Sequence, residues 1–175
     1  YNLRKKIKEQ PGRIPLTEIA EIYRSVCSGL HYAHQQGIVH CDIKPENILI
    51  DAAGKALLSD FGIASFTGMR ELIPGGIGTP AYMAPEQILN KKVTPQTDIY
   101  ALGATLYALL SGRTPPSSVD LAAGAVLPSL RSANNKISPT LARAIERAMK
   151  LNAGERFPSV DEMYTAITGR PLPTT

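Results

Sequence analysis

The sequence predicts a mainly α fold of the α+β class that contains one small β-hairpin. Its 175 residues are 43% hydrophobic and 19% charged, which suits a globular domain with a sizeable core and excludes a disordered chain. Apolar residues recur at helical spacing along several segments. Two short apolar runs in the middle of the chain flank a glycine-containing loop, which is typical of a hairpin.

The first half of the chain predicts two helices and the hairpin. A short basic helix is expected over residues 3–10, ended by Pro11-Gly12. A long helix follows, with Thr17 as its N-cap and Gly37 as its stop. Its apolar residues lie three or four apart and form one stripe: Ile19, Ile22, Tyr23, Val26, Leu30 and Ala33. The hairpin strands are residues 48–50 and 56–58.

Residues 60–86 predict a long irregular loop, because they contain five glycines and three prolines. A loop of this length inside a compact domain usually has a function. A helix buried on all sides should follow, capped by Thr97, running to Ser111 and stopped by Gly112.

The C-terminal third predicts two more helices. Residues 117–137 are expected to be mostly irregular. Ser138-Pro139 opens one helix, because a cap is followed there by proline at the first helical position. Residues 159–162 form a capping box that opens the last helix, and Gly169 closes it. Residues 170–175 are expected to begin a linker.

Composition excludes several classes of protein. The longest apolar run, residues 101–110, is too short to span a bilayer, and no signal peptide is visible. Two cysteines favour a reducing compartment, so we expect a cytoplasmic protein. The first residue is not Met, so we expect the chain to begin inside a longer protein.

The net charge of +4 comes largely from one N-terminal segment. Its basic residues are Arg4, Lys5, Lys6, Lys8 and Arg13. Such a cluster can bind nucleic acid. No aromatic residues interleave the charges, so we favour a solvated helix face and expect no nucleic-acid partner.

The chemistry concentrates in residues 40–47 and in Asp60, thirteen residues after Asn47. The hairpin brings its two outer ends together, so Asp60 should lie near Asp42 and Asn47. Carboxylate and amide oxygens suit Mg²⁺, which takes few protein ligands and completes its shell with phosphate and water. Lys44 would offset phosphoryl charge, and Asp42 would accept a proton from an attacking hydroxyl.

These residues resemble the motifs of the protein kinase family: His40-Cys41-Asp42, Asp60-Phe61-Gly62 and Ala84-Pro85-Glu86. The resemblance covers nearly the whole chain and implies the C-terminal lobe of a kinase over residues 1–169. It also extends to the Asp and Gly of the buried helix, Asp98 and Gly103, and to a late Arg156.

The resemblance implies a role for each matching position. Asp42 is the base, Lys44 contacts phosphate, and Asn47 and Asp60 hold Mg²⁺. Glu46 would touch the ribose of ATP through its backbone, and Leu49 would lie under the adenine. Four further residues are implied to be structural: His40, Glu86, Asp98 and Arg156.

The acceptor class is implied in the same way. Lys44 and the segment Gly78-Thr79-Pro80 resemble serine/threonine kinases. Residues 33–40 and 156–160 are similar to bacterial kinases of the eukaryotic-like type. The expected partners are ATP and a protein with a Ser or Thr acceptor. Thr79 is expected to bond Asp42 and Lys44.

The sequence departs from the family pattern in two ways. No glycine-rich phosphate loop or strand lysine precedes the catalytic segment, so the missing N-terminal lobe is an implied partner, and we expect the isolated chain to be inactive. Cys41 replaces the arginine that pairs with a phosphate on the activation loop. We therefore expect activity without loop phosphorylation.

Two alternatives remain. A pseudokinase would use the same fold as a binding or scaffold module, but Asp42, Lys44, Asn47 and Asp60 are all present. A small-molecule kinase of the antibiotic-phosphotransferase type would lack Ala-Pro-Glu and its arginine partner.

Overall fold

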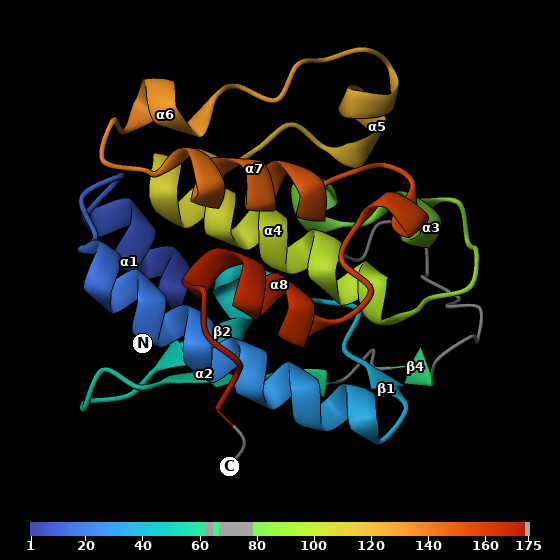
Figure 1. The fold of residues 1–175 in the computed structure, drawn as a ribbon, viewed down its shortest axis with the longest axis horizontal. Helices are drawn as coiled ribbons and strands as arrows, with labels where there is room; N and C mark the ends of the chain where they lie inside the picture. The colour runs from blue at the N-terminus through green and yellow to red at the C-terminus, as the bar shows by residue number, and fades with distance from the viewer. Residues whose placement is uncertain (62–64, 67–78, 174–175) are drawn as a thin grey trace.

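The structure is a computed structural model that describes residues 1–61, 65–66 and 79–173. Helix α4 (Pro95–Ser111) runs through the middle, with α7 (Pro139–Ala148) along one side and α8 (Val160–Thr168) and α2 (Leu16–Gln35) along the other (Figure 1). A small hairpin lies behind α2. The predicted fold class, mainly helical with one small hairpin, is confirmed.

The N-terminal helices agree with the sequence except at one cap. Helix α1 (Leu3–Glu9) is capped by Asn2, whose side chain accepts a bond from the Lys5 N–H. Helix α2 begins at Leu16, so the prediction of Thr17 as its N-cap was wrong. Pro15 occupies that position. Its ring has no polar atom that could cap the helix, but its fixed φ suits a helix start.

The hairpin is confirmed with its predicted bounds. Strand β2 (Ile48–Ile50) pairs antiparallel with β3 (Ala56–Leu58), and Ile48 lies opposite Leu58. A second small ladder was not predicted. Strand β1 (Ile38–Val39) pairs with β4 (Ser65–Phe66), within the segment that the sequence left irregular.

Helix α4 is buried on all sides, as predicted, but it starts earlier than expected. Thr94 is the N-cap, and Thr97 is the third helical residue, whose hydroxyl accepts the Thr94 N–H. Gly112, with a φ of 69°, ends the helix. Gly103 allows α7 to approach closely, since a Cβ there would lie 2.8 Å from the Cβ of Ala148.

Short helical elements interrupt the loops on either side of α4. They are η1 (Pro45–Asn47), η3 (Pro80–Tyr82), α3 (Pro85–Ile88), α5 (Ser118–Ala122), α6 (Leu130–Ala133) and η4 (Ala153–Glu155). Helices α5 and α6 lie within residues 117–137, where mostly irregular structure was expected. The Ser117 hydroxyl caps α5 by accepting the Asp120 N–H. Ser138 and Ser159 cap α7 and α8, as predicted.

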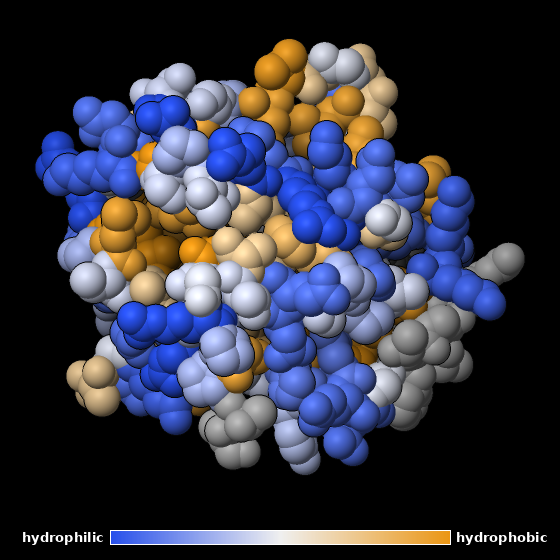
Figure 2. Space-filling model, in the orientation of Figure 1, coloured by the Kyte–Doolittle hydropathy of each residue, from blue (hydrophilic) through white to orange (hydrophobic). Residues whose placement is uncertain are grey.

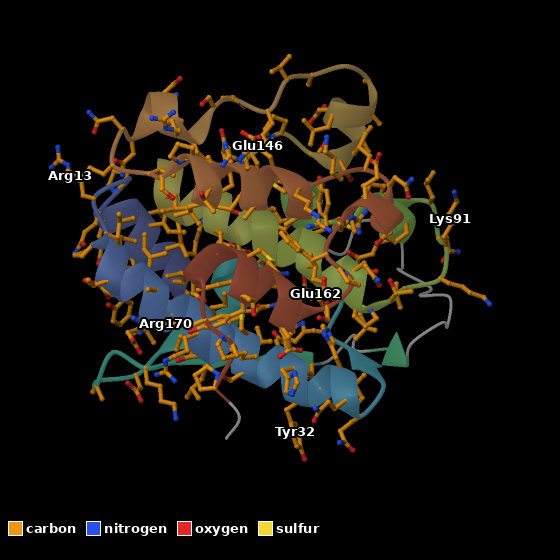
Figure 3. The ribbon with its side chains drawn as sticks, in the orientation of Figure 1. Arg13, Tyr32, Lys91, Glu146, Glu162 and Arg170 are labelled. Atoms are coloured by element: carbon orange, nitrogen blue, oxygen red, sulfur yellow. The ribbon has the colours of Figure 1, made fainter. Side chains whose placement is uncertain are left out.

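The core extends to the end of the described chain. Leu172 is buried in it, within the segment that we predict to begin a linker. The face seen in Figure 2 is mostly hydrophilic, with an apolar hollow of about 250 Å³ that is lined by residues of α2, α4, α7 and α8. Charged side chains such as Arg13 and Lys91 project outward (Figure 3). No helix among residues 1–61, 65–66 and 79–173 is long and apolar enough to cross a membrane.

The basic N-terminal segment is partly neutralised by acidic side chains. Arg4 pairs with Glu46, and Lys6 pairs with Glu18. Lys6 is buried, so the prediction of a fully solvated face was wrong at this residue. Its pKa is raised above the ordinary value, chiefly by the bond to Glu18.

Candidate active site

The segment that carries the kinase-like residues runs from β1 to β2 and is held by hydrogen bonds to Asp98 of α4. Asp98, with no exposed surface, accepts the backbone N–H of His40 at 2.8 Å and that of Cys41 at 2.9 Å. Hydrogen bonds from backbone N–H groups to an ionised carboxylate are short and strong. Asp98 therefore fixes the backbone immediately before Asp42.

His40 is buried and joins the segment to β3. The Asp42 N–H donates to Nδ1 of His40 at 3.2 Å, so Nδ1 is the acceptor of the ring. The other nitrogen, Nε2, then carries the hydrogen and donates to the carbonyl of Ser59 at 3.0 Å. Both nitrogens are occupied by backbone groups, which suits a structural histidine and leaves no free base.

Asp42 lies at the centre of a compact polar network. Lys44 Nζ donates to both of its carboxylate oxygens, at 2.8 and 2.7 Å. The side-chain amide of Asn47 donates to the Asp42 carbonyl at 2.9 Å and to Oδ2 at 2.7 Å. The carboxylate is thus held by two side chains, one of them cationic, and remains only partly buried.

Asp60 lies two residues after β3, the strand that pairs with β2, and β2 begins directly after Asn47. The Ser59 N–H donates to the Asn47 carbonyl at 2.9 Å, and the ring of Phe61 lies 4.4 Å from that of His40. Asp60, between these two contacts, is exposed and has a φ of 68°. The left-handed region is costly for a residue other than glycine and often marks a functional position.

The residues expected to contact the nucleotide follow this network in the chain, in η1 and β2. Leu49, in the middle of β2, is 42% exposed although its neighbours on the strand are buried. Glu46, in η1, pairs with Arg4 at 3.5 Å. An exposed leucine beside a polar network provides an apolar surface on which a flat ring can lie.

The segment before α3 differs from the expectation. Gly78 lies outside the described residues. Thr79 is partly buried and Pro80 begins η3. Within the part of the chain that the structure describes, the hydrogen bonds of Asp42 and Lys44 involve His40, Asn47 and each other, and none joins them to Thr79. The expected Thr79 bonds are therefore not formed.

Glu86 and Arg156 form a bidentate ion pair, with N–O distances of 2.7 and 2.9 Å. The Arg156 side chain has no exposed surface. Its other N–H groups donate to three backbone carbonyls, those of Gln96, Lys150 and Leu151. All five guanidinium donors are used, so this buried charge is fully satisfied.

The ionisation of Glu86 reflects this environment. Burial raises the pKa of its carboxyl, but bonds from Arg156 and from the Thr97 hydroxyl outweigh burial and hold that pKa below the ordinary value of 4.5. Glu86 therefore stays ionised at neutral pH. The pair links α3 to α4 and to the loop before α8.

Two further residues belong to these networks. We expected His34 at the surface or in an interhelix contact, and the second is confirmed, because its Nε2 in α2 donates to Asp98 of α4 at 2.8 Å and its side chain is nearly buried. Gln87 was not singled out, yet its buried amide donates to the Cys41 carbonyl at 2.7 Å. No sequence signal pointed from Gln87 to Cys41, which lies 46 positions away.

The comparisons with known proteins agree with this geometry. Residues 2–164 match the protein kinase domain. The chain belongs to the protein kinase family. It is 37% identical to serine/threonine-protein kinase C of Synechocystis sp. over 169 residues, which covers 91% of this chain and 31% of that protein.

Two further bacterial relatives have similar names. The chain is 35% identical over 165 residues to the serine/threonine-protein kinase PknA of Corynebacterium glutamicum, covering 91% of this chain and 35% of that protein. It is 32% identical over 193 residues to PknD of Chlamydia trachomatis, covering 91% and 20%. The chain thus spans about a third or less of the length of these relatives.

Proposed function

We propose that the full-length protein is a serine/threonine protein kinase and that this chain supplies most of its C-terminal lobe. The observation that carries the proposal is the Asp42 carboxylate, held by Lys44 and Asn47 on a backbone fixed by Asp98. Such positioning is what a general base needs. Asp42 accepts the proton of a Ser or Thr hydroxyl, and Lys44 stabilises charge on the transferring phosphoryl group.

The donor set fits magnesium and ATP. Asn47 uses its amide nitrogen toward Asp42, so its oxygen is the atom that can face a cation, and Asp60 adds an exposed carboxylate. One or two such oxygens are the usual protein share of a magnesium–nucleotide site. When bound, ATP would supply the γ-phosphate and Mg²⁺ would offset part of its negative charge. Glu46 and Leu49 would contact the ribose and the adenine.

The remaining groups of the site come from outside this chain. Kinase catalysis also needs a lysine–glutamate pair that orients the ATP phosphates, and we assign this pair to an N-terminal lobe. Residues 1–175 alone should therefore not transfer phosphate. The two cysteines, Cys27 and Cys41, are buried and form no disulfide, which supports a cytoplasmic location.

The test is phosphoryl transfer by the full-length protein. It is incubated with γ-labelled ATP and a generic protein substrate such as casein, with Mg²⁺ or with excess chelator, and the labelled amino acids are identified. We expect magnesium-dependent label on Ser or Thr, lost in Asp60→Asn and kept in the surface control Glu162→Gln. Nucleotide binding without transfer would instead support the scaffold alternative.

A further inference from the structure

Gln87 connects two parts of the proposed active site that lie far apart in sequence. It belongs to α3, immediately after the Ala84-Pro85-Glu86 motif, and is 3% exposed. Its Nε2 donates to the carbonyl of Cys41 at 2.7 Å, and its Oε1 accepts the N–H of Ala84 at 3.1 Å. One side-chain amide therefore bridges the start of α3 and the catalytic segment.

Cys41 is the point where the catalytic segment is most strained. Its φ is 66°, in the left-handed region, although it is not glycine. Such a conformation persists only where surrounding groups determine it. Here Asp98 accepts the N–H of Cys41 at 2.9 Å while Gln87 holds its carbonyl. The peptide groups on both sides of Cys41 are fixed, and the second of them leads directly into Asp42.

The side chain of Cys41 cannot form the ion pair with a phosphate that the family resemblance implies at this position. The thiol is buried in a small cluster with Val39 and Val93. By resemblance, an arginine here would pair with a phosphorylated activation loop and order the catalytic segment. A buried thiol lacks the charge and the donors for that pairing. The Gln87 amide makes a connection between the same two regions that needs no charge.

We propose that Gln87 is a positioning residue that couples α3 to the catalytic segment and so holds Asp42 in its working orientation without a phosphate. This inference rests on the proposed kinase function and adds a mode of regulation to it. The connection is part of the folded structure and needs no covalent modification to form. A Leu at position 87 keeps the volume but removes the donor, and a Glu keeps the acceptor for Ala84 but removes the donor to Cys41.

The experiment uses the full-length protein, treated with a broad-specificity phosphatase that is then removed. Wild type, Gln87→Leu, Gln87→Glu and the exposed control Gln35→Leu are compared by steady-state kinetics with Mg-ATP and casein, below their melting temperatures. In both position-87 variants we expect kcat to fall by about 10²-fold, as for a slightly misplaced catalytic group. KM for ATP should stay close to that of wild type, because the nucleotide contacts are intact.

Each other outcome has a definite meaning. Position-87 variants that keep the wild-type kcat, a rise in KM alone, or loss of the folded state in both variants overturn the positioning role. Loss of wild-type activity after phosphatase treatment overturns the phosphate-free coupling. If the untreated wild-type protein labels no substrate, the proposed kinase function itself has failed. That outcome differs from failure of the Gln87 proposal, because it is seen in wild type without any variant.

Discussion

Lys44 and Asp42 form a two-pronged contact in which the ammonium lies 2.8 and 2.7 Å from the two carboxylate oxygens. The proposed base and the proposed phosphate contact, two residues apart in the chain, are therefore held as one unit. The contact ties the position of each group to the other. Substitutions of the two residues should have different effects, because Lys44 carries a positive charge and Asp42 does not.

Replacing Lys44 by Met should lower kcat of the full-length protein by about 10²–10³-fold, the usual effect of removing one stabilising donor from a developing charge. Steady-state kinetics at saturating Mg-ATP measures the change. The matched control is Lys55→Met in the exposed hairpin loop, which should leave kcat unchanged. Equal effects of the two substitutions would remove Lys44 from the phosphate role.

Asp98→Asn should destabilise the kinase domain and reduce activity together. The buried carboxylate accepts from the backbones of His40 and Cys41 and from the His34 ring, and an amide can replace only part of this. We expect a loss of about 3 kcal/mol in the free energy of unfolding, typical of charged hydrogen bonds. Urea denaturation measures it. Asp161→Asn, on a half-exposed carboxylate, should cost under about 1 kcal/mol.

Breaking the Glu86–Arg156 pair should cost about 3–5 kcal/mol of stability from either side, because the partner stays buried and charged. The substitutions Glu86→Gln, Arg156→Met and their combination form a double-mutant cycle read by urea denaturation. The double variant should lose less stability than the two single losses combined. Additive losses would mean that the two side chains contribute independently.

The same pair predicts how stability depends on pH. The pKa of Glu86 is lower in the folded state than its ordinary value of 4.5, so its contribution is fully present above that value. The contribution is lost as the pH falls through the folded pKa. Melting temperatures should thus fall more steeply for wild type than for Glu86→Gln below about pH 4.5. Parallel curves would contradict the assignment.

Local signals in the sequence predicted much of the fold. The hairpin bounds, the αL glycine after α4 and the capping serines of α7 and α8 are set by neighbouring residues, so they were predictable. The errors at Thr17 and Thr97 have one cause. A proline near each helix start fixes φ at a helical value ahead of the predicted cap: Pro15 is the N-cap of α2, and Pro95 follows the Thr94 cap of α4, so each helix begins earlier than Thr17 or Thr97 suggested.

The site was less predictable, because its supports are not local. The motifs identified Asp42, Lys44 and Asn47, which lie within six residues of one another. The bonds from Asp98 and Gln87 to the backbone of Cys41 span 57 and 46 residues. Their lengths and partners depend on how α3 and α4 pack, which no residue pattern specifies. The prediction that Thr79 bonds Asp42 and Lys44 was wrong for the same reason, since it also depended on contacts between distant residues.

Activity should not depend on a phosphate in the activation loop. Cys41 is buried and cannot pair with one, so Thr67→Ala in the full-length protein should keep more than about half of the wild-type kcat. Kinetics of protein purified with and without a phosphatase measures this. Near-complete loss of activity in Thr67→Ala would show that the loop hydroxyl is required.

The most direct test of the kinase assignment is the turnover number of Asp42→Asn in the full-length protein. Asparagine keeps the size of the side chain and its place beside Lys44 and Asn47 but cannot accept the proton of a hydroxyl. The account predicts that kcat falls by about 10²–10⁴-fold while the protein stays folded. An unchanged kcat would contradict it, because the residue around which the whole network is built would then take no part in the reaction.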